Sequence, residues 1–199
     1  MTGDTDPKLT RRDALAALAA AGVTAGTAGC NAIATDRDEG TADGPGDRSG
    51  PEPPFGPVGQ REFAVLTAAA GVLYPGELDG IDEFVAEFVS GRATEQPDHA
   101  AGIAEAARYV EEWSRSWMDE GFVELDRSDR EAALDRMGAR EADPDPDGGD
   151  VERVRYYVVN ELLFALYSSP TGGKLVGIEN PQGYPGGAES YRRGPQSGE

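Results

Sequence analysis

The feature that most restricts the fold of this chain is residues 151–167, which are apolar around nearly the whole circumference of a helix. Only Asn160 and Glu161 interrupt the apolar run of its second half. Such a helix is buried on every side or faces a partner. It is too short to cross a bilayer, which takes ~20 apolar residues. We expect one part to be core and the other an interface, although a helix enclosed by the rest of the domain remains the alternative.

Four earlier segments have the apolar spacing of amphipathic helices. The first ends at Pro75-Gly76, and the last begins at a capping-box pair, Ser128 with Glu131. No segment alternates convincingly with period two. The fold class is therefore all-α, a small bundle of about five helices over residues 58–168. The apolar stripes of the four segments lie within residues 63–74, 81–89, 103–117 and 132–137.

Two segments rich in glycine, proline and polar residues flank this domain. Residues 31–57 offer almost nothing to bury, which predicts a disordered acidic linker. Residues 169–199 predict an irregular Pro/Gly-rich arm and tail. The arm nevertheless carries Leu175, Ile178 and Tyr184, so we expect it to lie over its own domain or over a partner.

The first 30 residues have the layout of a twin-arginine export signal. Arg11 and Arg12 precede a weakly apolar, alanine-rich run that ends in small residues and Cys30. The signal predicts export of a folded protein to the outer face of the cytoplasmic membrane, with lipidation at Cys30. An ordinary helix that starts at Thr10, and an unmodified thiol, are the alternatives. Asp13 is unusual in a region of positive charge.

The chain is strongly acidic, with 37 acidic and 18 basic residues and a formal net charge of -19. Such a surface repels nucleic acid and anionic headgroups. The carboxylates are spread along the chain, which is typical of proteins that stay soluble at high salt, where self-repulsion is screened. We therefore expect a salt-loving, haloarchaeal-like source. An acidic face for a basic partner is the alternative.

The residue types needed for common catalytic and metal sites are scarce. One histidine and one cysteine cannot supply the usual zinc, haem or iron–sulfur ligands. Residues 143–148 imitate the start of a calcium loop, but Val154 stands where a bidentate glutamate belongs. His99 is expected to face solvent near a helix start. We therefore predict no catalytic, cofactor-binding or metal-binding residue in this chain.

Exposed aromatic and apolar residues are the candidate site instead. Trp113 and Trp117 lie one turn apart and are either core residues or interface anchors. The predicted partner interface consists of Trp113, Trp117, Phe164, Tyr167, Leu175, Ile178 and Tyr184.

The order of these features resembles the gluconate 2-dehydrogenase subunit 3 family over about residues 58–187. The similarity is carried by the helix end at residues 74–76, by the aromatic helix, and by the stretches 173–178 and 183–186. The chain departs from the family pattern because Gly183-Tyr184-Pro185-Gly186 follows residues 173–178 only after a gap. The docking pose of the arm therefore does not carry over.

The resemblance implies a non-catalytic small subunit of an exported sugar or polyol dehydrogenase. Such a subunit escorts a large FAD-containing subunit, and a cytochrome or quinone-linked partner takes the electrons. FAD is then expected in the partner, with no cofactor in this chain.

Two alternatives from other classes remain. One is a free-standing surface lipoprotein that binds a small ligand in a helical pocket. The other is a cofactor-free enzyme that uses carboxylates such as Glu161.

Overall fold

The computed structural model describes residues 7–22 and 55–177, which form a helical domain with no β-strand in those two ranges. The fold class is thus all-α, as the sequence predicted. The elements, in chain order, are α1 (Arg11–Ala20), α2 (Gln60–Leu73), α3 (Ile81–Glu95), α4 (Pro97–Trp117), α5 (Arg127–Met137), α6 (Asp150–Val154), the π-helical turn η1 (Arg155–Asn160), α7 (Glu161–Ser168) and α8 (Pro170–Leu175).

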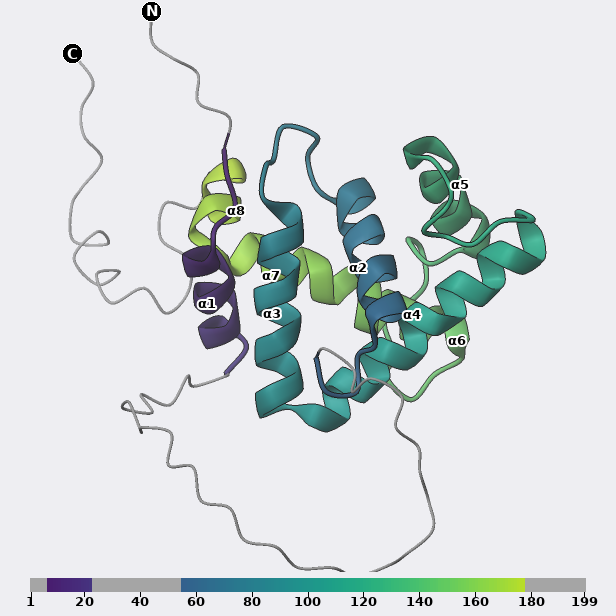
Figure 1. Cartoon of the computed structure of the whole chain (residues 1–199), viewed down its shortest axis with the longest axis horizontal. Coiled ribbons are helices and arrows are strands. Elements are labelled where there is room, and N and C mark those ends of the chain that lie inside the picture. The colour runs from purple at the N-terminus through teal and green to yellow at the C-terminus, as the bar shows by residue number, and fades with distance from the viewer. Residues whose placement is uncertain (1–6, 23–54, 178–199) are drawn as a thin grey trace, which may run out of the picture.

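Helix α2 lies at the centre of the arrangement (Figure 1). It contacts α3, α4, α5, η1 and α7, whereas α1 and α8 pack at the α3 and α7 side. The figure shows α5 and the C-terminal end of α4 at the opposite side of the molecule from α1 and α8. The domain therefore has two distinct ends with α2 between them.

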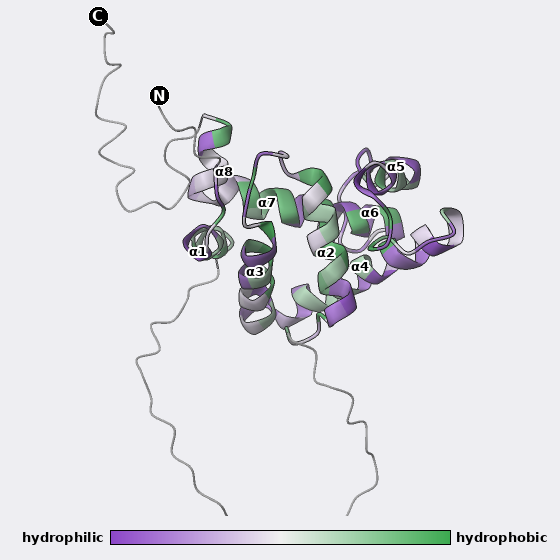
Figure 2. Ribbon diagram, turned by 45° about the horizontal axis from the view of Figure 1, so that its top comes forward, coloured by the Kyte–Doolittle hydropathy of each residue, from purple (hydrophilic) through white to green (hydrophobic). Residues whose placement is uncertain are grey.

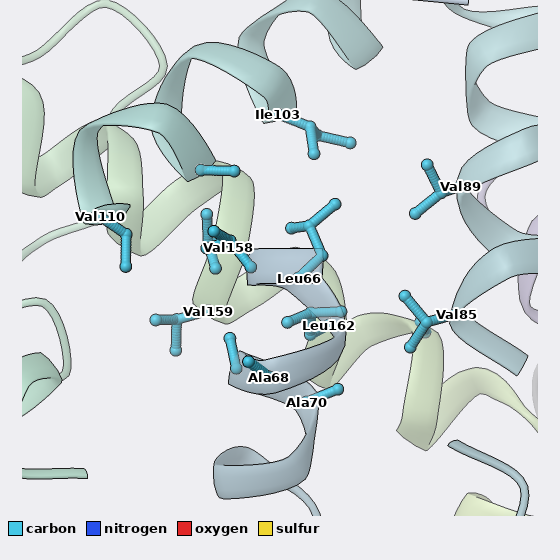
Figure 3. Close-up of a cluster of buried hydrophobic side chains, with 14 of the residues drawn as sticks. Leu66, Ala68, Ala70, Val85, Val89, Ile103, Val110, Val158, Val159 and Leu162 are labelled. Carbon is cyan, nitrogen blue, oxygen red and sulfur yellow. The ribbon is translucent and has the colours of Figure 1, made fainter. Parts of the chain in front are cut away.

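The core is continuous from α2 into every neighbouring helix. Figure 2 shows the apolar residues concentrated on α2 and α7, with hydrophilic residues on α5 and on much of α3 and α4. The side chains that meet around α2 are fully or almost fully buried. Figure 3 labels among them Leu66, Ala68, Ala70, Val85, Val89, Ile103, Val110, Val158, Val159 and Leu162.

Proline ends α2 as the sequence predicted. Tyr74 has an extended backbone (ψ 151°), because a residue before proline disfavours helical geometry. Its ring is 2% exposed, and its hydroxyl donates a hydrogen bond of 2.8 Å to the Leu162 carbonyl on α7. Burial raises the pKa of this hydroxyl, and the nearby Glu161 carboxylate adds to the rise. The hydroxyl therefore keeps its proton and ties the end of α2 to α7.

The apolar helix expected over residues 151–167 is one rod made of α6, η1 and α7. Its inner side is buried, with six apolar side chains at most 2% exposed: Val154, Val158, Val159, Leu162, Ala165 and Leu166. Phe164 and Tyr167 on the other side are 38% and 40% exposed. The expectation that one side of this helix forms core is confirmed. The expectation that its other side is an interface stays a prediction.

The start of α5 differs from the predicted capping box. The cap is Asp126, whose carboxylate accepts a hydrogen bond of 2.9 Å from the Asp129 amide. That bond and a hydroxyl bond from Ser128 lower the Asp126 pKa. The prediction of Ser128 as the cap is wrong, because an aspartate two residues earlier already satisfies the free amide.

The arm begins with a short helix, where the sequence predicted irregular structure from residue 169. The Ser169 hydroxyl caps α8 by accepting from the Gly172 amide at 3.0 Å, and Pro170 occupies the first turn. A Cβ at Gly172 would lie 2.0 Å from the Leu166 carbonyl oxygen. Glycine is therefore needed for the close approach of α8 to the end of α7. Residues 178–199, including Ile178 and Tyr184, lie outside the described residues.

The expected signal segment forms α1, which packs against α3, α7 and α8. Thr10 caps it, and the Asp13 carboxylate accepts a hydrogen bond from the Thr10 amide. Ala14, Ala17 and Leu18 are at most 4% exposed. Residues 7–21 are therefore part of the packed domain. The predicted linker residues 31–54 lie outside the described residues.

Replacing Tyr74 with Phe is expected to destabilise the domain by about 1 kcal/mol, because a buried hydrogen bond between α2 and α7 is lost. Denaturant unfolding measures the change. Tyr167→Phe is the matched control, since its ring is 40% exposed, and should change stability by less than about 0.5 kcal/mol. Equal stability of Tyr74→Phe and the wild type would contradict the role given to this bond.

Candidate functional site

A polar cavity of about 420 Å³ opens where α1, α3, α4, η1 and α7 meet. Its floor is charged, and its rim carries aromatic rings. The lining residues are Ala20, Ala21, Arg92, Gln96, His99, Tyr156, Asn160, Glu161 and Phe164.

A buried ion pair holds the floor of this cavity. Arg92 Nε lies 2.5 Å from Glu161 Oε1, and the two side chains are only 8% and 10% exposed. Arg92 Nη1 also donates to Gln96 Oε1 at 2.6 Å. The guanidinium lies 5.4 Å from the Phe88 ring centroid and 5.9 Å from that of Phe164. Two of its nitrogens and two neighbouring aromatic rings thus hold the guanidinium in position.

His99 belongs to the same cluster, although the sequence predicted that it faces solvent. Its side chain is 21% exposed, and its Nε2 lies 3.2 Å from Glu161 Oε2. The start of α4 packs against the π-helical turn, which places the imidazole 5.2 Å from the Tyr157 ring centroid and 6.1 Å from that of Tyr156. The prediction is wrong because packing against η1 turns the imidazole inward and half-buries it, while Pro97 and Asp98 stay exposed.

The cavity has the chemistry of a polar binding site. A π-helical turn, which is frequent at functional sites, ends at its wall in Asn160. Glu161 is the one acid in the lining, and no serine, threonine or cysteine joins it. The convergence of several acids that a carboxylate enzyme needs is therefore missing from this cavity. Over residues 7–22 and 55–177 there is no cluster of three His, Cys, Asp or Glu residues that could hold a metal ion.

The predicted interface residues fall into two separate groups. Trp113 and Trp117 stack with centroids 6.1 Å apart at the C-terminal end of α4. Trp113 packs partly into the core, whereas Trp117 is 72% exposed. Phe164 and Tyr167 lie on α7 and Leu175 on α8, and Figure 1 shows α8 at the opposite side of the molecule from the C-terminal end of α4.

The second group is part of a larger set of exposed apolar side chains. Phe164, Tyr167, Leu175, Val176 and Leu15 are 38–50% exposed. They come from α1, α7 and the end of α8, which contact one another. We call these five residues the apolar patch. Of the large hydrophobic side chains exposed in the described residues, Trp117 alone lies outside it.

Sequence reasoning missed Arg92 and Leu15. Arg92 follows the apolar stripe of residues 81–89 by three positions, so a charged residue on a buried helix face was the available signal. Its partner lies 69 positions away in the chain, which no local pattern indicates.

The export residues are partly described. Arg11 is 80% exposed and lies 3.9 Å from Glu87, and Arg12 is also exposed. Cys30 lies outside the described residues. No helix among the residues that the structure describes is long and apolar enough to span a membrane.

These features describe a helical protein in which exposed apolar side chains lie beside a cavity with a charged floor. A family model described as Gluconate 2-dehydrogenase subunit 3 matches residues 60–186. The match covers more than half of the chain, so the chain belongs to this family, whose members are accessory subunits of a dehydrogenase complex. No curated protein and no solved structure gives a match.

A double-mutant cycle should show strong coupling across the buried ion pair. Glu161→Leu is expected to cost roughly 3 kcal/mol, because it leaves the Arg92 charge buried without a carboxylate. Arg92→Met is expected to cost less, since His99 remains 3.2 Å from Glu161. The double variant should be more stable than the sum of the two losses predicts.

The Arg108–Glu62 pair is the control, because its arginine side chain is 52% exposed. The coupling free energy between Arg108 and Glu62 should not exceed about 1 kcal/mol. Additive losses at Arg92 and Glu161, measured by denaturant unfolding, would show that the pair contributes no coupling.

Proposed function

We propose that this chain is the non-catalytic small subunit of an exported, FAD-dependent sugar or polyol dehydrogenase. It binds the large flavoprotein subunit, stabilises it and accompanies it across the membrane. FAD and the chemistry of substrate oxidation then belong to the large subunit, and a cytochrome or quinone-linked subunit accepts the electrons. Membership of the family supports this proposal at the level of an accessory subunit.

The observation that carries the proposal is the apolar patch. Large apolar side chains exposed together on a soluble domain mark a protein interaction surface. Aromatic anchors such as Tyr167 and Phe164 are typical of interface centres.

The polar cavity borders the patch, because Phe164 belongs to both. A large subunit that covers Phe164 would therefore also close the mouth of the cavity. Its polar groups would then contribute orientation and specificity, while the aromatic residues contribute affinity.

We also propose that Arg11 and Arg12 are read as a pair by the translocase for folded proteins, and that Cys30 carries a lipid anchor. The paired arginines, the alanine-rich run and the cysteine support this proposal. The exposure of Arg11 and Arg12 on the folded domain is compatible with recognition after folding.

Tyr167→Ala should weaken binding to the purified large flavoprotein subunit by about 30-fold, which corresponds to about 2 kcal/mol. The ring is 40% exposed, so the stability of the isolated domain should hardly change. Trp117→Ala is the matched control, since it removes an exposed aromatic from the other end of the molecule. Titration calorimetry measures both affinities. A larger loss of affinity for Trp117→Ala than for Tyr167→Ala would contradict this interface and place it at the C-terminal end of α4.

Changing Arg11 and Arg12 together to Lys should keep the charge but hold the protein in the cytoplasm, because the translocase recognises the guanidinium pair. Cell fractionation and immunoblotting measure the distribution. Lys8→Arg is the control, since it alters a neighbouring cation outside the pair. Normal export of the double-lysine variant would contradict the twin-arginine proposal.

A further inference from the structure

Helix α1 fits closely against a surface formed by α3, α7 and α8, which we call the α1 seat. Leu9, Ala14, Ala17 and Leu18 are 0–4% exposed there. Leu18 lies directly over Gly91 of α3, where a Cβ would stand 2.2 Å from a Leu18 methyl carbon. The seat is therefore shaped for a helix with small residues and one leucine.

The Asp13 carboxylate also holds α1 in its seat. Asp13 is 4% exposed and accepts hydrogen bonds from the Thr10 amide at 3.0 Å and from the Thr171 amide of α8 at 2.8 Å. The preceding residues add a backbone bond of 2.9 Å from the Leu9 amide to the Asp79 carbonyl. Asp13, which is unusual in the charge pattern of a signal, thus has a structural role in the seat.

Several observations indicate that α1 is separable from the rest of the domain. The family match begins at Gln60, the first residue of α2, and does not include α1. Residues 23–54 join α1 to the domain, and a chain can extend by ~3.3 Å per residue. Two of the four buried apolar side chains are alanines, which bury little area.

We propose that α1 is a displaceable occupant of its seat, and that a helix of the large dehydrogenase subunit replaces it when the complex forms. This inference rests on the proposed function. The replacing helix carries small side chains in place of Ala14 and Ala17, a leucine-sized side chain in place of Leu18, and a carboxylate in place of Asp13.

The seat is continuous with the proposed interface. Ala20 and Ala21 of α1 line the same cavity as Phe164 of α7, and Asp13 binds the start of α8. A partner that covers the apolar patch therefore reaches the edge of the seat at both ends of α1. Release of α1 would expose its apolar run next to Arg11 and Arg12. The assembled complex of small and large subunits would then present the whole export signal.

Three variants of the full chain test this proposal. Leu18→Glu should expel α1 and leave the seat empty. Gly91→Leu should expel α1 and also block the seat, because a larger side chain takes the place of Leu18. Ala19→Glu is the matched control, since Ala19 follows Leu18 directly on the same helix, is exposed and lies outside the apolar patch.

Hydrogen exchange of residues 13–20 reports on α1, and far-UV circular dichroism melting checks that the domain stays folded. The binding probes are a labelled peptide of residues 7–22 and the purified large subunit. Leu18→Glu should lose α1 protection and bind both probes about tenfold more tightly than wild type, because α1 no longer competes. Gly91→Leu should lose protection and bind both probes more weakly than Leu18→Glu. Ala19→Glu should match wild type in every measurement.

Retained protection of α1 in Leu18→Glu, or failure of the folded variant to bind the peptide, would overturn the displaceable seat. Equal binding of the large subunit by wild type, Leu18→Glu and Gly91→Leu would overturn replacement by the partner. Weakened binding by Ala19→Glu would overturn it as well, since α1 would then stay in place and contact the partner. If none of the four chains binds the large subunit, the proposed function itself fails, and the peptide titrations alone then report on the seat.

Discussion

The burial of one face of the α6–η1–α7 rod is the constraint on which the rest of the domain depends. Complete burial of each large side chain on that face contributes roughly 1.5–3 kcal/mol, so the inner face is a major source of stability. Helices α2 and α4 cover it, and α3 packs against both of them. Their number does not suffice to enclose the whole rod, so Phe164 and Tyr167 remain exposed. Phe164 and Tyr167, the two patch residues that lie on the rod, therefore belong to the same sequence feature that forms the core.

The π-helical turn keeps the buried side chains of α6 and α7 on the same side of this rod. Val154, Val158, Leu162 and Leu166 recur every four residues and are all buried. At 3.6 residues per turn, each step of four drifts by about 40° around an α-helix. The wider turn at residues 155–160 takes back part of that drift and keeps the four side chains on the core. The same turn brings Glu161 to Arg92 and His99, so core packing and the polar cavity have one geometric cause.

Local patterns predicted the elements well where local forces decide. The apolar spacing placed α2, α3, α4 and the rod, and Pro75 fixed the end of α2. The misses have tertiary causes. Helix α8 forms because Gly172 allows close contact with α7, and His99 is half-buried because α4 starts against η1. The Arg92–Glu161 pair joins residues 69 positions apart, so the sequence shows the two charges on apolar helices without showing that they meet.

The weak hydrophobicity of the N-terminal segment suits both an export signal and a helix that packs on the folded domain. An alanine-rich run is apolar enough to pack on a helical surface but too weakly apolar and too short to act as a membrane span. The same weakness limits the area that α1 buries, which is mainly that of Leu9 and Leu18. A leucine-rich segment would bind its own domain too tightly to be released, and a charged one would not bind at all. The composition of residues 14–21 therefore suits a helix that packs on the folded domain and can still leave it.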